Sequence, residues 1–326
     1  MARLFYDSTL TLVYDPVSAN RTATRAALFT LGFRTIETVQ TLDAFVEAMR
    51  RRPPDLALCE AQGSDEALCA AIQSIRQDAA GFNPFIAIIV TAWEKGAGLV
   101  NRVVNSGADD LLLRPFSTAL LGQRIDTLVE RRKGFVVTTD YIGPDRRRDA
   151  ARPSNVELFH PPNSLRMKAF DRLSNEDTAL RMDAELREAC RTLNIEKLKR
   201  DAFQIAILWK LMQDESPGSE VYREQLRRVA QIANGVRRRA ADTEFGKSTE
   251  WCASILAGVE GLERGVDRNA SMHLLGHASI SLCRMFQPHR AADEILAEVE
   301  STAAVILARN AAVSGPALSP PVAAAR

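Results

Sequence analysis

The chain has 326 residues, 46% of them hydrophobic and 25% charged, and a formal net charge of +1. This composition is typical of folded globular proteins, and the near-neutral charge gives no general attraction for nucleic acid or anionic membranes. The five cysteines are dispersed, which disfavours a disulfide framework or a zinc site. No apolar run reaches the length of a membrane span, so we expect a soluble cytoplasmic protein with two domains.

Short apolar runs alternate with segments of helical periodicity in the first part of the chain. The runs expected to be strands lie at residues 10–15, 33–37, 55–60, 85–91 and 110–114. Their spacing is that of repeated βα units. Because the runs are apolar almost throughout, helices should cover both faces of the sheet. We therefore predict an α/β domain with a (βα)5 doubly wound parallel sheet, and functional side chains at the carboxyl ends of its strands.

The rest of the chain is predicted to hold a linker, a helical bundle and a tail. Residues 133–172 combine prolines with basic residues and show little periodicity, which indicates an extended linker. Helical periodicity then begins after Ser174, a residue suited to an N-cap, and continues to about residue 310. The predicted divisions are the α/β domain at 1–132, the linker at 133–172, an all-α bundle at 173–310 and a disordered tail at 311–326.

Four motifs fall at the ends of predicted strands: "LVYDPVSANR", "PDLALCE", "IIVTA" and "GADDLLLRPF". In this order they resemble the signature stretches of the response-regulator receiver domain of two-component signalling, across most of residues 8–132. The resemblance implies a flavodoxin-like fold in which a strand-three aspartate accepts a phosphoryl group from a histidine kinase. It also implies an acidic pair that binds Mg²⁺, a threonine or serine and a lysine that contact the phosphoryl oxygens, and an aromatic residue that responds to phosphorylation.

Several of these positions depart from the family pattern. Asp15 and Thr91 match it. Pro16 fills the position of the second acidic residue, Glu60 that of the phosphoacceptor aspartate, and Arg114 that of the lysine. The resemblance therefore identifies a degenerate receiver pocket in which Glu60 is equivalent to the phosphoacceptor.

The substitutions weaken both metal binding and nucleophilic attack. Two carboxylates and one arginine leave a formal charge of −1, against −2 for three carboxylates and a lysine. Mg²⁺ requires several oxygen ligands in octahedral geometry, and Pro16 supplies no side-chain oxygen. The longer glutamate also displaces the nucleophile by about 1 Å, which costs on the order of 10²-fold in rate. We expect no cofactor, lost Mg²⁺ binding and no enzymatic activity.

Two interpretations of this pseudo-receiver remain open. Either Glu60 and Arg114 form a permanent ion pair that imitates the phosphorylated state, or the pocket has drifted and the fold is kept as a scaffold. In a sheet of order 2-1-3-4-5, Thr91 would be close enough to bond Glu60. We expect a partly exposed pair that contributes about 0.2–1 kcal/mol to stability. Leu111 stands where the aromatic residue would be, so we expect one fixed state.

An alternative function comes from the stretch "MHLLGHASISL" at 272–282, which resembles the histidine-containing helix of phosphotransfer domains. His273 would then relay phosphoryl groups, although Gly276 and His277 replace the lysine and glycine of that pattern. Helical periodicity places Leu275 on a buried face and both histidines outside it. The two histidines lack a third zinc ligand, so no metal site is expected.

Two arginine runs, at 146–149 and 235–240, raise nucleic-acid binding as a further alternative. The balanced overall charge favours a solvated face or an acidic protein partner instead. The sequence contains no phosphate-binding loop and no ATP-binding motif of a histidine kinase. It thus predicts a non-enzymatic regulator or adaptor in a two-component phosphorelay pathway that acts through protein partners. A homodimer stays open, and no membrane association is expected.

Overall fold

The computed structural model describes residues 4–77, 82–94, 96–146, 158–241 and 243–313. The chain divides into two compact units, Met1–Leu193 and Asn194–Arg326. None of the helices in these ranges is both long and apolar enough to cross a membrane.

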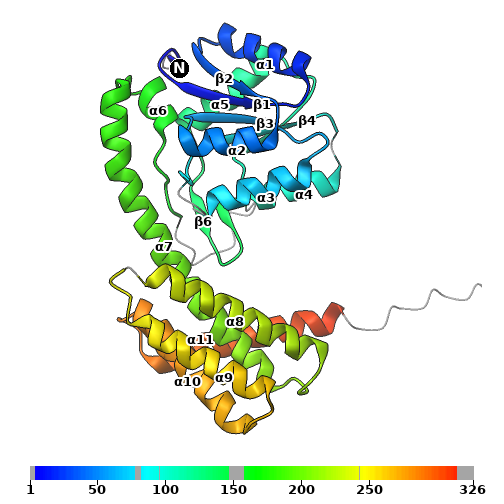
Figure 1. Ribbon diagram of the computed structural model, residues 1–326, viewed down its shortest axis with the longest axis vertical. Coiled ribbons are helices and arrows are strands. Elements are labelled where there is room, and N and C mark those ends of the chain that lie inside the picture. Colours follow the sequence, from blue (N-terminus) through cyan, green and yellow to red (C-terminus); the bar gives the residue numbers. More distant parts are fainter. Residues whose placement is uncertain (1–3, 78–81, 95, 147–157, 242, 314–326) are drawn as a thin grey trace, which may run out of the picture. The chain divides into compact units, whose positions relative to one another are not determined.

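The first unit is built on a five-stranded parallel sheet with the order β2-β1-β3-β4-β5 (Figure 1). Its strands are β1 (Leu10–Tyr14), β2 (Thr35–Val39), β3 (Leu56–Glu60), β4 (Ala87–Ala92) and β5 (Asp110–Leu113). The helices between them are α1 (Ser18–Thr30), α2 (Leu42–Arg51), α3 (Asp65–Arg76), α4 (Ala97–Ser106) and α5 (Thr118–Glu130). The predicted doubly wound fold and strand order are confirmed, with β2 beginning at Thr35 and not at residue 33.

Helices cover both faces of this sheet. On one face, side chains of α2, α3 and α4 pack on β1, β3 and β4, for example Phe45, Leu68 and Val103. On the other face, α1 and α5 pack through Leu28 and Leu121. The three central strands are buried at every position, which explains why they are apolar without alternation.

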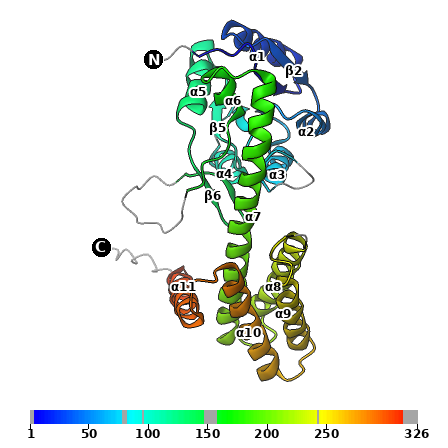
Figure 2. The same cartoon turned by 90° about the vertical axis from the view of Figure 1, so that its left-hand side faces the viewer.

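The second unit is a helical bundle. It contains the end of the long helix α7 (Asn175–Gln213), then α8 (Glu220–Ala240), α9 (Ser248–Glu263), α10 (Arg268–Phe286) and α11 (Ala292–Val313). Figure 2 shows α9 beside α10, where Gly258 leaves no room for a Cβ atom against Leu275 without a shift. The predicted bundle helices are confirmed, and Ser174 accepts from the Asp177 amide as predicted for a cap. Residues 314–326 of the predicted tail lie outside the described residues, whereas 311–313 belong to α11.

The prediction of an extended linker at 133–172 needs correction. Its described parts form β6 (Phe135–Val137), β7 (Ile142–Pro144) and α6 (Ser164–Ala169), and they pack on the first unit. The side chains of Phe135 and Leu165 are fully buried. The boundary between the units therefore lies after Leu193 inside α7, and not at residue 132. Elements of three to six residues are too short to show a repeating apolar pattern, so no periodic signal predicts them.

A buried charged network holds this extension in place, beside the amino ends of β4 and β5. The carboxylate of Asp109 accepts from Arg76 at 2.9 Å and from Arg132 at 2.8 Å. The same two guanidiniums also donate to backbone carbonyls, and the ring of Phe135 lies about 5 Å from each of them. Burial acts to raise the pKa of Asp109, but the charges of Arg132 and Arg76 outweigh it and hold that pKa below its usual value.

Replacing Asp109 by asparagine should therefore destabilise the first unit in a pH-dependent way. At pH 7 we expect a loss of about 3–5 kcal/mol, because two buried guanidiniums lose their anion. The folded-state pKa of Asp109 is depressed, so its stabilisation is complete above the unfolded value of about 3.9. That stabilisation disappears as the pH falls through the folded value, and the difference between variant and parent should shrink. Urea unfolding at pH 7 and at acid pH measures this difference.

The adjacent variant Asp110→Asn is the matched control, because Asp110 is 24% exposed and pairs with Arg124, which is 45% exposed. It should cost no more than about 1 kcal/mol at either pH. A pH-independent loss in Asp109→Asn would contradict the assignment of the stabilisation to the ionised carboxylate.

Candidate functional site

The carboxyl ends of four strands bring the predicted pocket residues together. Asp15 follows β1, Glu60 ends β3, and Arg114 follows β5. Thr91 in β4 is in register with Glu60. The sheet order places β1 and β4 on either side of β3, so these four side chains converge on one point. The structure therefore brings together all four pocket residues that the sequence predicts.

Glu60 lies at the centre of the site with both carboxylate oxygens occupied. Its Oε2 atom accepts from the hydroxyl of Thr91 at 2.7 Å and from Nε of Arg114 at 2.7 Å. Its Oε1 atom accepts from the backbone N–H of Gln62 at 3.1 Å. The predicted ion pair between Glu60 and Arg114 and the predicted bond from Thr91 are thus present.

Arg114 also reaches the first acidic position. Its Nη2 atom lies 3.2 Å from Oδ2 of Asp15 and donates to the hydroxyl of Thr24 at 3.0 Å. The other oxygen of Asp15 accepts from the Val17 amide at 2.8 Å. The guanidinium plane lies near the ring of Phe116, 4.8 Å from the ring centre. The guanidinium of Arg114 therefore bridges the two carboxylates, and it also contacts the hydroxyl of Thr24 and the ring of Phe116.

The expectation of a partly exposed pair was wrong. The side chain of Arg114 is 8% exposed, that of Glu60 is 1% exposed and that of Asp15 is fully buried. The longer glutamate side chain therefore does not project into solvent, because Arg114 lies over it. The planar guanidinium gives one nitrogen to each carboxylate and does not pair with Glu60 alone through two parallel bonds. The contribution of this pair to stability is therefore estimated as for a buried ion pair and not as for an exposed one.

The residues at this site do not fit a divalent cation. Pro16 has no side-chain ligand, and its carbonyl oxygen and that of Asp15 accept from Arg21. The guanidinium of Arg114 lies between the two carboxylates that would bind the metal. Burial raises the pKa of Asp15, and the nearby charge of Glu60 adds to this rise, while the Val17 amide and Arg114 oppose it. Arginine is thus the cation of this site.

Thr24 and Phe116 were missed at the sequence level, although Thr24 carried a signal. Thr24 is buried on α1 four residues before the buried Leu28, so a polar side chain lies on the apolar face of that helix. Such a position indicates a hydrogen-bond partner inside the fold. Phe116 is the residue after Pro115, whose peptide bond to Arg114 is cis. Nothing in the sequence distinguished the contact of Phe116 with Arg114 from ordinary core packing.

Two hollows flank the closed ion pair, and the exposed side chain of Trp93 lines both of them. The first lies along α1 and includes Ala23, Arg114 and Phe116. The second lies between the loops after β3 and β4 and includes Gln62 and Leu99. Trp93 is 45% exposed, which is unusual for a large aromatic side chain at the carboxyl edge of a covered sheet.

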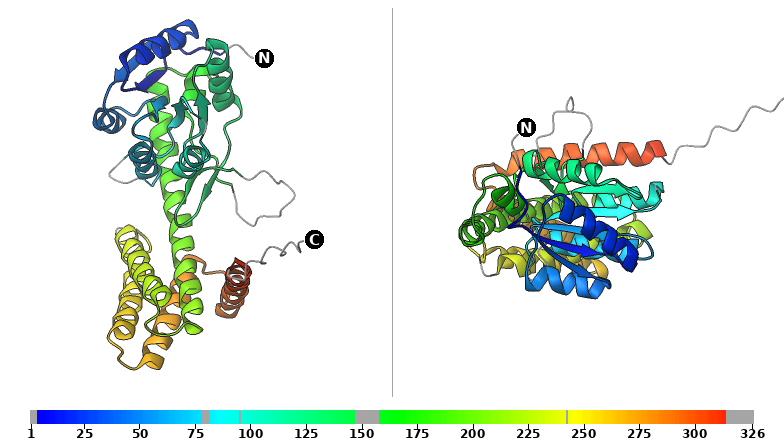
Figure 3. Two further views of the ribbon diagram at one scale, coloured as in Figure 1. Left: turned by 90° about the vertical axis from the view of Figure 1, so that its right-hand side faces the viewer. Right: turned by 90° about the horizontal axis from the view of Figure 1, so that it is seen from above.

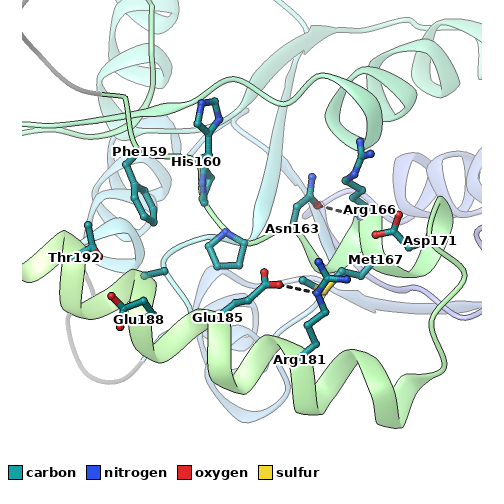
Figure 4. Close-up of a pocket in the computed structure, with 13 residues that line it drawn as sticks. Phe159, His160, Asn163, Arg166, Met167, Asp171, Arg181, Glu185, Glu188 and Thr192 are labelled. Carbon is teal, nitrogen blue, oxygen red and sulfur yellow. Dashed lines mark hydrogen bonds and ion pairs between the residues drawn. The ribbon is translucent and has the colours of Figure 1, made fainter.

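A third hollow lies away from this pocket, between the segment after β7 and the first half of α7 (Figure 4). Its charged side chains include Arg181 and Glu185, which pair with each other at 2.7 Å. Asn163 caps α6 by accepting from the Arg166 amide. None of the residues predicted as a site lies here. Within the described ranges, no cluster of three or more His, Cys, Asp or Glu side chains is suited to a metal ion.

The other predicted positions lie as the sequence indicated. Leu111 packs at the edge of the apolar core beneath α4. On α10, Leu275 is buried, whereas His273 and His277 are exposed, which confirms the predicted faces of that helix. His277 contacts the ring of Trp251 edge to face. Only Arg146 of the first arginine run lies within the described residues, and it donates to the Asp109 carbonyl.

Removing the cation should destabilise the first unit far more than removing an exposed one. In Arg114→Ala two buried carboxylates lose their partner, and we expect the free energy of unfolding to fall by about 3–5 kcal/mol. The matched control is Arg124→Ala, where the arginine is 45% exposed and pairs with Asp110. That control should cost no more than about 1 kcal/mol. Hydrogen exchange of the amides of β3, β4 and β5 measures the loss of stability in both variants. Equal losses in Arg114→Ala and Arg124→Ala would contradict a buried pair.

No family model and no curated protein matches the sequence. The similarities that were found are to solved structures. A signal receiver domain of a two-component histidine kinase from Clostridium thermocellum is 15% identical over 38% of this chain and 99% of its own, with a TM-score of 0.35. A response regulator from Thermotoga maritima is 22% identical over 37% and 97%, with a TM-score of 0.32. A response-regulator receiver domain from Bermanella marisrubri is 22% identical over 38% and 100%, with a TM-score of 0.33.

Proposed function

We propose that this chain is a non-enzymatic signalling regulator whose first unit is a pseudo-receiver locked in one state by Arg114. It acts by contacts with protein partners in a two-component pathway, and it neither accepts a phosphoryl group at Glu60 nor uses Mg²⁺. The observation that carries this proposal is the buried guanidinium of Arg114, bonded to both Glu60 and Asp15.

The occupied oxygens of Glu60 support a pocket without phosphoryl chemistry. A carboxylate that attacks phosphorus needs a free oxygen, a metal ion to neutralise charge and an open approach. Here both oxygens of Glu60 accept hydrogen bonds, one of them from Arg114, and the Glu60 side chain is only 1% exposed. The energetic barrier to reaction is therefore the disruption of a buried ion pair, added to the loss of the metal ligand at Pro16.

The same contacts support a single conformational state. Phosphorylation in a receiver-like pocket would introduce negative charge beside a threonine and a cation. In this chain Glu60 already supplies a permanent negative charge that accepts from Thr91 and Arg114. Leu111 offers no ring whose rotation could report a change. The permanent ion pair is thus the better supported of the two interpretations, since a drifted pocket would have no reason to keep every polar atom of Glu60 bonded.

A surface for a protein partner lies next to the locked pair. The hollow along α1 is lined by small side chains such as Ala23 and by the aromatic rings of Trp93 and Phe116. Exposed aromatic residues beside small ones are typical of protein interfaces. Since Arg114 also lines this hollow, the state of the ion pair and the shape of the surface are physically linked.

No contact of His273 favours the phosphotransfer alternative beyond its exposure on α10. Nucleic-acid binding through α8 gains no support either, because Arg223 and Arg227 pair with glutamates of the same helix and Arg239 pairs with Asp201. Both alternatives stay as predictions from the sequence, and the first is decided by the experiment below.

Phosphorylation can be tested by restoring the pattern that the pocket lacks. Incubation with a small phosphodonor and Mg²⁺, followed by intact mass measurement, should leave the parent chain unchanged. The triple variant Pro16→Asp, Glu60→Asp, Arg114→Lys regains the second acid, the shorter nucleophile and the open lysine, and should gain the mass of one phosphoryl group. The single variant Glu60→Asp is the control and should stay unmodified, because Arg114 still covers the site.

A phosphoryl group on Glu60 of the parent chain would overturn the proposal. A phosphoryl group that disappears in His273→Gln would instead establish the phosphotransfer alternative. Amide shifts followed during a Mg²⁺ titration give an independent reading. We expect no saturable binding to the parent chain below about a millimolar, since the site lacks the oxygen ligands that a hard cation needs.

The partner surface can be tested by photo-crosslinking from two neighbouring positions of α1. A photoreactive residue in place of Ala23 lies in the hollow, whereas one in place of the exposed Thr22 lies outside it. In cells that express the full chain, Ala23 should cross-link to a protein and Thr22 should not. The cross-link should weaken when Arg114 is also changed to alanine. Equal cross-linking from both positions would contradict a partner at this hollow.

A further inference from the structure

Helix α11 carries an apolar face that the second unit does not cover. The helix packs into the bundle through Ile295, Val299 and Ala303, which recur at every fourth residue and are buried. Beyond them, Val305 is 50% exposed and Leu307 is 38% exposed. Figure 2 and Figure 3 show α11 standing apart from α8 and α9 of the same unit.

The exposed side of the helix has the composition of a close helix–helix contact. Residues 301–308 contain no charged side chain. The outward positions Ala297, Ser301, Ala304 and Ala308 are separated by four, three and four residues, and all are exposed. Such spacing keeps side chains on one stripe of a helix that faces another helix. Val305 and Leu307 border this stripe on its two sides.

The charges at the ends of α11 indicate what covers this face. Glu298 and Glu300 precede the uncharged segment, and Arg309 follows it. By helical spacing Glu298, Val305 and Arg309 share one edge of the stripe, while Glu300 and Leu307 share the other. The carboxylates of both glutamates are half exposed, so each can take a second cation besides its partner within the chain. The helix is therefore complementary in charge to its own reversed copy.

We propose that this face of α11 is a homodimer interface, on which the α11 helix of a second copy of the chain lies antiparallel. A twofold axis near Val305 places Val305 and Leu307 close to their own counterparts and Ala304 close to the second copy's Ala308. It also directs Arg309 toward the second copy's Glu298. A parallel arrangement would instead place glutamate beside glutamate, and like charges oppose association. One patch that contacts itself is the geometry of a twofold dimer.

The oligomeric state of the full chain tests the proposal. Light scattering after gel filtration and sedimentation velocity should show a dimer for the parent chain. In the double variant Val305→Glu, Leu307→Glu the dissociation constant of the dimer should rise by about tenfold or more. The control is Val221→Glu, which introduces the same charge at a 53% exposed valine of α8 and should leave the dimer unchanged. Circular dichroism checks that all three chains keep their helices.

Oxidative cross-linking tests the orientation without depending on a disruptive variant. In a Cys190→Ser background the other native cysteines are buried, so a new cysteine is the accessible thiol. Val305→Cys should give a covalent dimer because it lies near the axis, and Asp293→Cys should not because it lies three turns away. Cross-linking from both positions would indicate a parallel pair and overturn the proposal. A parent chain that stays monomeric, or a dimer that survives the double variant, would also overturn it.

Discussion

The first unit depends on one electrostatic constraint: two carboxylates are buried where the strands end, and they require a cation. Water cannot solvate Asp15 and Glu60 there, because both side chains have almost no exposed surface. An ionised carboxylate without a partner in such a place costs several kcal/mol. Arg114 supplies the charge and Thr91 donates to Glu60, while Thr24 accepts from Arg114 and two backbone amides occupy the remaining oxygens.

This constraint explains why arginine suits the position after β5. Lysine would place a compact charge on one carboxylate, whereas the planar guanidinium has several nitrogens at fixed angles and reaches both. The same plane also lies against Phe116, a contact that a lysine ammonium would make less well. The site is therefore fully bonded within the chain.

Much of the fold was accessible from the sequence for simple physical reasons. The central strands are almost continuously apolar because helices cover both faces, so their number and their place in a covered parallel sheet could be inferred. Glu60, Thr91 and Arg114 could be placed together because parallel strands end at one edge. Leu275 and the two histidines of α10 followed from helical spacing. In each case a repeating pattern extends over enough residues to identify the element.

The rest depended on contacts that no local pattern encodes. Asp109, Arg76 and Arg132 lie far apart in the chain, and each looks like an ordinary surface charge in sequence. Their burial follows from the docking of Phe135. Phe135 lies in a strand of only three residues, which is too short to be predicted from a sequence pattern. The exposure of the Glu60–Arg114 pair was also misjudged, because the side chain of Arg114 itself covers Glu60. Tertiary proximity of distant charges and coverage by a single side chain are both properties of the folded chain.

The docked extension has a consequence for the order in which the chain folds during synthesis. The core formed by Phe85 and Phe135 is completed by Ala189 and Leu193 of α7, 76 and 80 residues after the last strand ends at Leu113. Domains fold as units while the ribosome still adds residues. A nascent chain that has exposed only the sheet and α5 would leave Phe85 uncovered and lack the ring of Phe135 beside Arg76. We therefore expect this unit to close only after the ribosome has released the residues up to Leu193, 80 residues beyond the end of β5 at Leu113.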